Sequence, residues 1–213
     1  MKKIIKNFYW TFLKRKNFSQ GLEEKFILDY FKKNNGFYID VGSHDPFRFS
    51  NTSLLYKRGW KGVNIDANEE TISRFNKFRK RDINIRALIS DKIKELEYYY
   101  LNDHALNGVL EKPRLEKLLN LNYKIIKKEK FQTITLDKIL EKITHPLALI
   151  DFLNIDVEGK ELDVLKSIDL NKYKVKIIMV EQNDKLNKIE NYLSKFNYKL
   201  IETIDRNLVF EKN

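Results

Sequence analysis

Residues 36–52, which read GFYIDVGSHDPFRFSNT, decide the fold of this chain. The apolar, partly β-branched run at 37–41 predicts a buried parallel strand with Asp40 inside it. Gly42 follows where the chain must turn sharply and bring its backbone close to a ligand. A short helix over 52–58 comes next. A strand, a glycine turn and a helix N-terminus predict a nucleotide-type site; the simpler interpretation is a buried strand and a turn.

This stretch does not carry the dinucleotide fingerprint GxGxxG, because His44 and Asp45 stand where that motif needs its later glycines. The site it predicts therefore has to be supported by other parts of the chain.

The composition limits the class of protein. A length of 213 residues predicts one domain with a substantial core. The absence of cysteine excludes disulfides and thiolate metal sites and is consistent with a reducing cytoplasm, where we expect the protein. The net charge of +11 is compatible with nucleic acid or an anionic membrane surface, but lysine is scattered over nearly every segment, as in a general compositional bias.

Residues 1–18, MKKIIKNFYWTFLKRKNF, predict a basic helical extension ahead of a single domain at 19–213. The basic opening is typical of a signal peptide, but Lys6 and Asn7 and then residues 14–16 interrupt the apolar run and no small-residue cleavage site follows, which argues against one. No stretch reaches the roughly 20 apolar residues of a membrane span. The extension can lie on a membrane as a peripheral amphipathic helix, or it can pack on its own domain or on a partner chain in an oligomer.

Apolar runs alternate with amphipathic segments along the rest of the chain. Strands are predicted at 61–65, 83–89, 95–101 (an edge strand), 147–157 and 176–180, and helices at 69–79, 114–121, 135–143 and 185–196. Residues 198–204 and 208–210 predict a final antiparallel hairpin. Residues 102–132 are the least regular and can cover a site or form a solvated basic face. This pattern predicts one α/β domain.

Polar residues follow four of the predicted strands. They are Gly42 to Asp45, Asp66, Asp156 with Glu158, and Glu181 with Asn183. Each taken alone can be a capping or turn residue. Because the carboxyl ends of parallel strands meet at one edge of a sheet, together they predict a ligand site there. Asp66, at the end of the second strand, is placed to accept the hydroxyls of a ribose.

At this point the sequence resembles the FkbM-type methyltransferases, which have the class I fold and depend on S-adenosylmethionine (SAM). The resemblance is carried by SQGLEE at 19–24, DVGSHDPFRFSNT at 40–52, RGWKGVNIDA at 58–67, ALN at 105–107 and LNIDVEGKELDVLKSID at 153–169. It implies a class I methyltransferase-like three-layer sandwich with a mostly parallel sheet and a C-terminal antiparallel hairpin. The hairpin is also predicted independently by the pattern above.

The resemblance implies where SAM would bind. Gly42 and its neighbours would hold the methionine end, Asp66 the ribose, and Ala87 and Leu88 would flank the adenine. The full set of implied cofactor contacts is Gln20, Asp40, Gly42, Ser43, His44, Asn51, Thr52, Asp66, Ala67, Ala87, Leu88 and Asp156. His44 departs from the small residues usual in this loop.

The chemistry requires an aligned acceptor and a base, because the methyl group on the sulfonium is already activated. Asp156 is the first candidate for the base; Glu158 and His44 are further catalytic candidates, although Glu158 can instead cap the following helix. Asp156, Glu181 and Asn183 also resemble the oxygen ligands of metal-dependent O-methyltransferases. A Mg²⁺ ion there would lower the pKa of the acceptor hydroxyl.

The resemblance implies an O-methyltransferase acting on a hydroxyl of a sugar, a glycan or a glycan precursor. One alternative is an RNA methyltransferase, suggested by the charge; another is a non-catalytic binding module of the same fold. The basic run at 124–130 has only Tyr123 and Phe131 beside it and no RNA-binding motif, which argues against nucleic acid.

Overall fold

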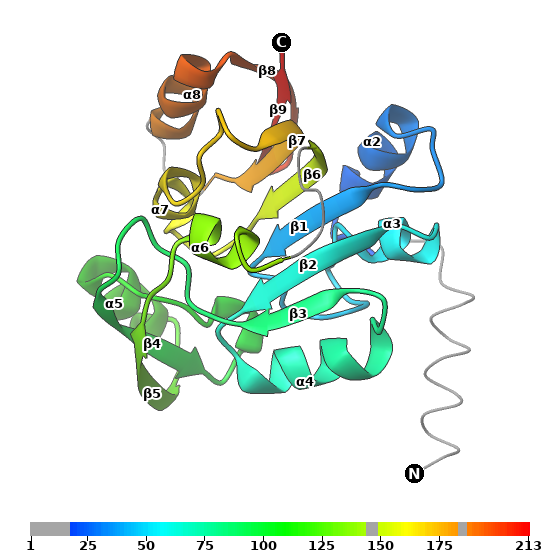
Figure 1. Ribbon diagram of the computed structural model, residues 1–213. Helices are drawn as coiled ribbons and strands as arrows, with labels where there is room; N and C mark the ends of the chain where they lie inside the picture. The colour runs from blue at the N-terminus through cyan, green and yellow to red at the C-terminus, as the bar shows by residue number, and fades with distance from the viewer. Residues whose placement is uncertain (1–17, 144–148, 183–186) are drawn as a thin grey trace, which may run out of the picture.

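The main sheet combines a parallel part with a C-terminal antiparallel hairpin (Figure 1). The computed structural model describes residues 18–143, 149–182 and 187–213. Its seven strands are β1 (Phe37–Val41), β2 (Lys61–Asp66), β3 (Ile83–Arg86), β6 (Leu149–Ile155), β7 (Lys174–Glu181), β8 (Tyr198–Ile204) and β9 (Asn207–Lys212). Their order is β3-β2-β1-β6-β7-β9-β8. The first five are parallel, and β9 is antiparallel to both β7 and β8.

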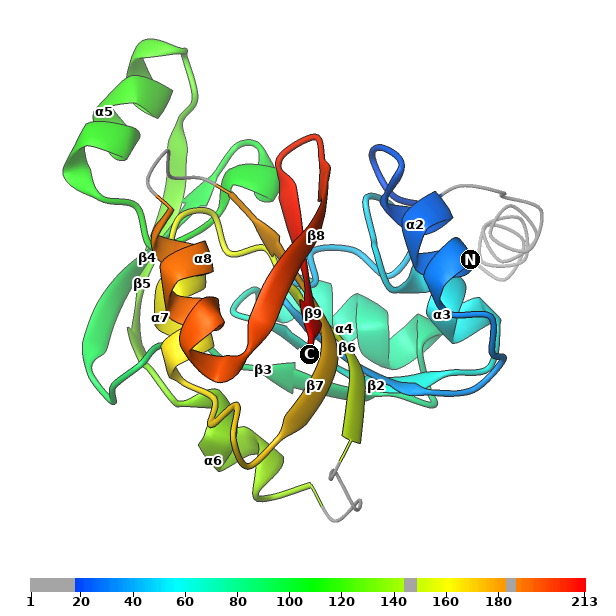
Figure 2. The same cartoon turned by 90° about the horizontal axis from the view of Figure 1, so that it is seen from above.

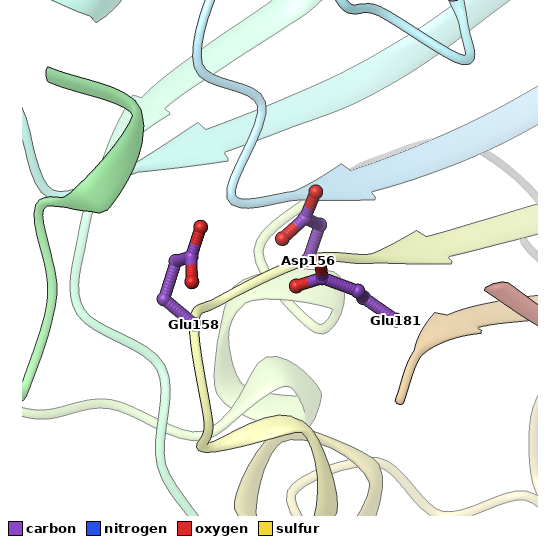
Figure 3. Close-up of side chains that lie close together, drawn as sticks. All are labelled: Asp156, Glu158 and Glu181. Atoms are coloured by element: carbon purple, nitrogen blue, oxygen red, sulfur yellow. The ribbon is translucent and has the colours of Figure 1, made fainter. Parts of the chain in front are cut away.

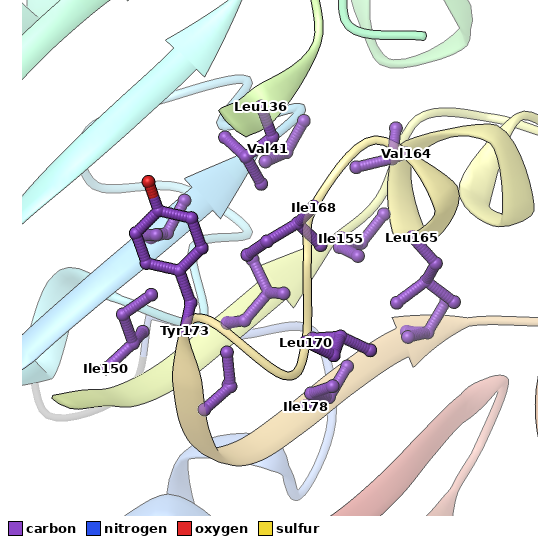
Figure 4. Packing of buried hydrophobic residues seen from close by; sticks show 14 of the residues in the cluster. Val41, Leu136, Ile150, Ile155, Val164, Leu165, Ile168, Leu170, Tyr173 and Ile178 are labelled. Carbon is purple, nitrogen blue, oxygen red and sulfur yellow. The ribbon is translucent and has the colours of Figure 1, made fainter. Parts of the chain in front are cut away.

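Helices cover both faces of this sheet (Figures 1 and 2). One face carries α6 (Leu136–Leu140), α7 (Glu161–Lys166) and α8 (Lys188–Leu193); the other carries α2 (Glu23–Tyr30), α3 (Ser53–Lys57) and α4 (Glu69–Phe78). Side chains alternate along each strand, so Val41 and Ile155 pack with Val164 and Leu165 of α7 (Figure 4). Tyr38 packs on the opposite face. The predicted three-layer α/β sandwich is confirmed.

A separate two-stranded sheet stands beside the main one. It pairs β4 (Glu95–Leu101) antiparallel with β5 (Ile125–Gln132), and α5 (Lys112–Asn120) connects them after a short 3₁₀ turn, η1 (His104–Leu106). The prediction of a strand at 95–101 is confirmed, but its place at an edge of the main sheet was wrong. β5 was not predicted, because its lysines leave most positions on both faces exposed and its apolar pattern is weak.

Some element boundaries differ from the predictions. The third strand ends at Arg86 and not at 89, since the chain leaves the sheet there and Ile89 only bridges to Ile134. The helix predicted at 135–143 covers Leu136–Leu140, where Thr135 caps it by accepting from the Lys138 amide. After α8 the chain continues as a 3₁₀ turn, η2 (Ser194–Phe196).

The helical extension predicted at 1–18 lies outside the described residues except for Phe18, which is buried in the core. Among the described helices, none has the length and apolar character to cross a membrane.

Candidate active site

The strand order creates a crevice between β1 and β6. The chain runs from β1 outward through β2 and β3 and then returns to β6 on the other side of β1. Ligands of open α/β sheets bind at such a switch point, beyond the carboxyl ends of the strands. The register pairs Val41 with Ile155, and the Asp156 amide donates to the Val41 carbonyl at 3.0 Å. Gly42 and Asp156 therefore leave the sheet side by side.

Only glycine fits at position 42. Its φ is +81°, and a Cβ added there would lie 1.7 Å from the Asp156 carbonyl oxygen. The Gly42 and Ser43 amides both donate to the Ile65 carbonyl at the end of β2. The glycine turn is thus held against the ends of β2 and β6.

A cleft of about 1120 Å³, open mouth included, lies over these strand ends. Of the residues predicted to contact the cofactor, it brings together Gln20, Asp40, Gly42, Ser43, His44, Asn51, Asp66, Ala67, Ala87, Leu88 and Asp156. The predicted catalytic and metal-binding Glu158 and Glu181 also line it. Asn183, predicted as a metal ligand, lies outside the described residues.

Thr52 is the exception among the predicted contacts. Its side chain is fully buried and does not line the cleft; it donates to Asp40 at 2.6 Å and accepts from Arg79 at 2.7 Å. The predicted direct contact between Thr52 and the cofactor is therefore corrected. Asp40 accepts a second bond from Asn154 at 2.9 Å, so it joins the loop after β1 to β6.

Asp66 lies at the end of β2 with its carboxylate turned toward the glycine turn. It accepts from the amides of His44 at 3.0 Å and Asn68 at 2.7 Å. Burial raises its pKa to about 6, against the opposing effect of these two hydrogen bonds. A carboxylate offers about four acceptor sites, so a ligand hydroxyl can still bind to it.

The loop after Gly42 carries two further polar groups. The Ser43 hydroxyl is buried, lines the cleft and has no hydrogen-bond partner within the described part of the chain. His44 has a left-handed backbone with φ of +53°, and its carbonyl accepts from the Thr71 hydroxyl. Burial lowers the pKa of the His44 imidazole, so it is neutral at pH 7.

Three carboxylates meet beyond β6 and β7 (Figure 3). Asp156, Glu158 and Glu181 each offer a carboxylate oxygen, and these oxygens lie within 4.8 Å of one another. Burial, followed by repulsion from Glu181 and Glu158, raises the pKa of Asp156 well above its usual range. Burial and Glu181 also raise the pKa of Glu158, to about 7, although Arg114 opposes this. Like charges at this separation do not all ionise together, so the cluster shares a proton near neutral pH.

Two arginines from distant segments contact this acidic cluster. Arg206, in the turn between β8 and β9, lies 2.7 Å from Glu181, and Arg114 of α5 pairs with Glu158. The Gly159 amide, near the start of α7, donates instead to Glu161. The alternative role of Glu158 as a cap for that helix is therefore wrong.

Sequence reasoning missed several residues that line the cleft. They are Phe49, Leu96, Tyr98, Gly108, Val109, Asn154, Lys160, Asp163 and Arg206, among others. Tyr98 is buried and also forms part of the cleft wall. The ALN motif at 105–107 was a direct sequence signal for part of this wall, since Ala105 and Asn107 line the cleft.

A mostly parallel sheet in this order, with a glycine turn and acids at its switch point, has the architecture of the class I methyltransferases. The chain belongs to the FkbM methyltransferase domain family, whose model matches residues 40–200. It is therefore a SAM-dependent methyltransferase, and the family resemblance seen in its sequence is confirmed. No curated protein sequence is significantly similar to it.

Solved methyltransferase structures show a weak similarity to this chain. TrmK from M. capricolum, in complex with S-adenosyl-homocysteine (SAH), is 12% identical with a TM-score of 0.45 over 85% of this chain, which spans 64% of that protein's length. A putative rRNA methylase from Clostridium thermocellum is 11% identical with a TM-score of 0.45, covering 93% of this chain and 97% of its own. A SAM-dependent methyltransferase from Aquifex aeolicus is 15% identical with a TM-score of 0.42, and the match covers 89% of this chain and 88% of that protein.

Proposed function

We propose that the protein is an O-methyltransferase that transfers the methyl group of SAM to a hydroxyl of a sugar, a glycan or a glycan precursor. The observation that carries the proposal is the meeting of Gly42, Asp66 and Asp156 in one cleft at the switch point of the sheet. The acceptor class rests on the family. Placement in the cytoplasm, membrane contact through residues 1–18 and oligomer formation stay predictions.

The residues of the cleft fit the three parts of SAM. The unpartnered Ser43 hydroxyl and the close approach of backbone at Gly42 suit the methionine end. Asp66 has acceptor sites left for ribose hydroxyls. The adenine would lie near Ala87 and Leu88, where Tyr98 adds an aromatic wall.

When bound, SAM supplies a methyl group on a positively charged sulfur. The chain has to orient the acceptor hydroxyl toward that group and take up its proton as the new oxygen–carbon bond forms and the carbon–sulfur bond breaks. Asp156 extends from the end of β6 into the cleft and is our choice for the base. His44 is neutral at pH 7 and also lines the cleft, so it is the second choice.

Mg²⁺ is a further hypothesis for this site. Asp156, Glu158 and Glu181 offer the hard oxygen ligands that Mg²⁺ prefers, and their ligand atoms lie within 4.8 Å of one another. An ion there would lower the pKa of the acceptor hydroxyl. Loss of activity with a chelator and its recovery with Mg²⁺ would support the ion; full turnover after chelation would remove it and leave Asp156 as the base.

The role of Asp66 is tested by SAH binding. Loss of a charge-assisted hydrogen bond costs about 1.5–3 kcal/mol, so Asp66→Ala should weaken SAH binding about tenfold or more. Calorimetry measures this, with the exposed Asp29→Ala variant as a matched control. Wild-type affinity in a folded Asp66→Ala protein would contradict the assignment.

The role of Asp156 is tested by separating binding from turnover. Asp156→Asn should keep SAH affinity within a few-fold and reduce methyl transfer at least about a hundredfold, the usual scale for a lost general base. Turnover is measured with labelled methyl groups over a panel of glycans and RNA. Transfer to RNA alone would favour the RNA methyltransferase alternative, and SAH binding without any transfer would favour a binding module.

A further inference from the structure

A second recess opens beside the cleft, between the loop before α2 and the turn that joins β8 to β9. It has about 430 Å³ of space, open mouth included, and it shares part of its lining with the main cleft: Gln20, Phe49, Asn51, Asp156, Glu181 and Arg206 line both. The two spaces therefore meet at the residue that we assign as the base. A group bound in the recess can present a hydroxyl to Asp156 while the cofactor fills the cleft.

The walls of the recess are tied together by contacts between the two ends of the described chain. The Asn207 side-chain amide donates to Glu23 at 2.9 Å, and Figure 2 shows the β8–β9 turn beside the loop that precedes α2. A Cβ added at Gly21 would lie 2.4 Å from the Asp205 carboxylate, so the turn and the loop are in close contact. The recess is therefore a built part of the fold and not a gap between unconnected loops.

Phe49 forms an aromatic wall in an unusual conformation. Its side chain is 37% exposed, and its φ of +56° is costly for a bulky residue. The Arg48 guanidinium lies 4.5 Å from the ring centroid, and the His44 ring is nearly parallel to it at 6.5 Å. The fold thus holds an aromatic ring at the mouth of the site, where the C–H groups of a sugar ring would find a complementary electron-rich surface.

The polar groups of the recess suit hydroxyls and not anions. Gln20, Asn51 and Asn207 carry amides with both donors and acceptors, as neighbouring hydroxyls require. The lining holds four carboxyl groups, those of Glu23, Asp156, Glu181 and Asp205, against the single guanidinium of Arg206. Arg206 is already engaged with Glu181. A phosphate or a carboxylate on the acceptor would be repelled there, in spite of the positive net charge of the chain.

We propose that this recess is the acceptor subsite and that it takes a neutral, hydroxyl-rich ring such as a sugar, with Phe49 as its aromatic wall. This proposal rests on the function proposed above and names the substrate class and the residues that select it.

Ligand-observed saturation-transfer NMR tests the proposal on the full chain with saturating SAH. The probes are neutral methyl hexopyranosides and methyl 6-deoxyhexopyranosides, with methyl glucuronide as the matched anion. At least one neutral glycoside should bind, and at least tenfold more tightly than the glucuronide. Asp205→Asn keeps the shape of the side chain and removes its negative charge. This variant should reduce the ratio between the affinities for the neutral glycoside and for the glucuronide several-fold.

Phe49→Gly separates a binding role from a structural one. It should weaken binding of the neutral glycoside at least tenfold and change SAH affinity by no more than a few-fold. Its melting temperature should not fall, because glycine adopts a positive φ freely. Phe131→Leu, on β5 and away from the recess, is the control for loss of an aromatic ring.

The outcomes distinguish the two proposals. Failure to bind SAH in calorimetry would overturn the proposed function itself. SAH binding without binding of any neutral glycoside, or with equal binding of the glucuronide, would overturn the acceptor subsite alone. Weaker SAH binding in Phe49→Gly, with glycoside binding intact, would assign the recess to the cofactor and overturn the proposal.

Discussion

Asp156 is our choice for the base, but it lies in surroundings that disfavour its ionised form. It accepts a proton only when ionised, yet burial and its neighbours Glu181 and Glu158 raise its pKa. In the unfolded chain an aspartate ionises near pH 3.9. Between that pH and the higher pKa of the folded state, the folded protein holds a proton that the unfolded chain has lost, so stability falls as pH rises through this window.

Asp156→Asn removes the destabilisation that comes from ionising Asp156 in the folded protein, and it also removes the base. We expect the variant to melt a few degrees above the wild type at pH 8, because each unit of pKa shift is worth about 1.4 kcal/mol and each kcal/mol about 2–4 °C in a chain of this size. The difference should shrink as the pH falls toward 4, where the wild-type carboxyl is protonated in the folded state and about half protonated in the unfolded chain. Calorimetric melting from pH 4 to 8 measures it. An Asp156→Asn protein less stable than the wild type at pH 8 would contradict the raised pKa.

At the scale of elements, the end of α4 supports the loop between β1 and α3. Arg79 follows α4 and is fully buried. Its guanidinium donates to the Ser50 hydroxyl at 2.7 Å and to the Pro46 carbonyl at 2.8 Å, besides Thr52. Through Thr52 it also supports Asp40. One side chain thus holds the segment that contains His44, Phe49 and Asn51.

Replacement of Arg79 should therefore affect both stability and binding. Arg79→Met keeps much of the volume but removes the cation that interacts electrostatically with the buried Asp40 and Asp82, and it leaves several buried hydroxyls without that donor. Loss of one partner from a buried ionic network costs about 3–5 kcal/mol. We expect a loss of that size in denaturant unfolding, and weaker SAH binding in the fraction that folds. Lys80→Met, at the exposed neighbouring position, serves as the control. Equal stability of the two variants would show that the network is dispensable.

These elements also show what the sequence can predict. The strand ends that carry Gly42, Asp66 and Asp156 were predictable, because buried strands have long apolar runs and their carboxyl ends align in a parallel sheet. The role of Arg79 was not, since its partners lie 15 to 41 residues earlier and no local pattern marks a buried arginine. Phe49 and Arg206 were missed for the same reason: the hairpin that brings Arg206 to the site is predictable, but its position against α2 depends on tertiary packing.

At the scale of the whole molecule, the positive charge is unevenly distributed. Residues 1–17 contain six lysines and arginines and no acidic residue. Residues 18–213 therefore carry +5 of the net charge of +11. On β5, Lys127 pairs with Glu129 at 2.7 Å and Lys128 with Glu97 at 3.2 Å. The lysines that gave the central region a basic appearance thus have carboxylate partners.

This distribution predicts where a polyanion would bind. Each charge that neutralises a phosphate of single-stranded RNA contributes about 0.7 to the slope of log affinity against log salt. Replacement of Lys14, Arg15 and Lys16 by glutamine should therefore lower the slope by about 2. Lys127→Gln with Lys128→Gln should lower it by less than about 1 and change turnover on a glycan only a few-fold, since paired, exposed charges contribute little. Fluorescence titrations of labelled RNA between about 50 and 200 mM salt give both slopes. A larger effect of the β5 pair, with methyl transfer to RNA lost alongside it, would place a nucleic-acid substrate on the β4–β5 sheet and overturn the glycan proposal.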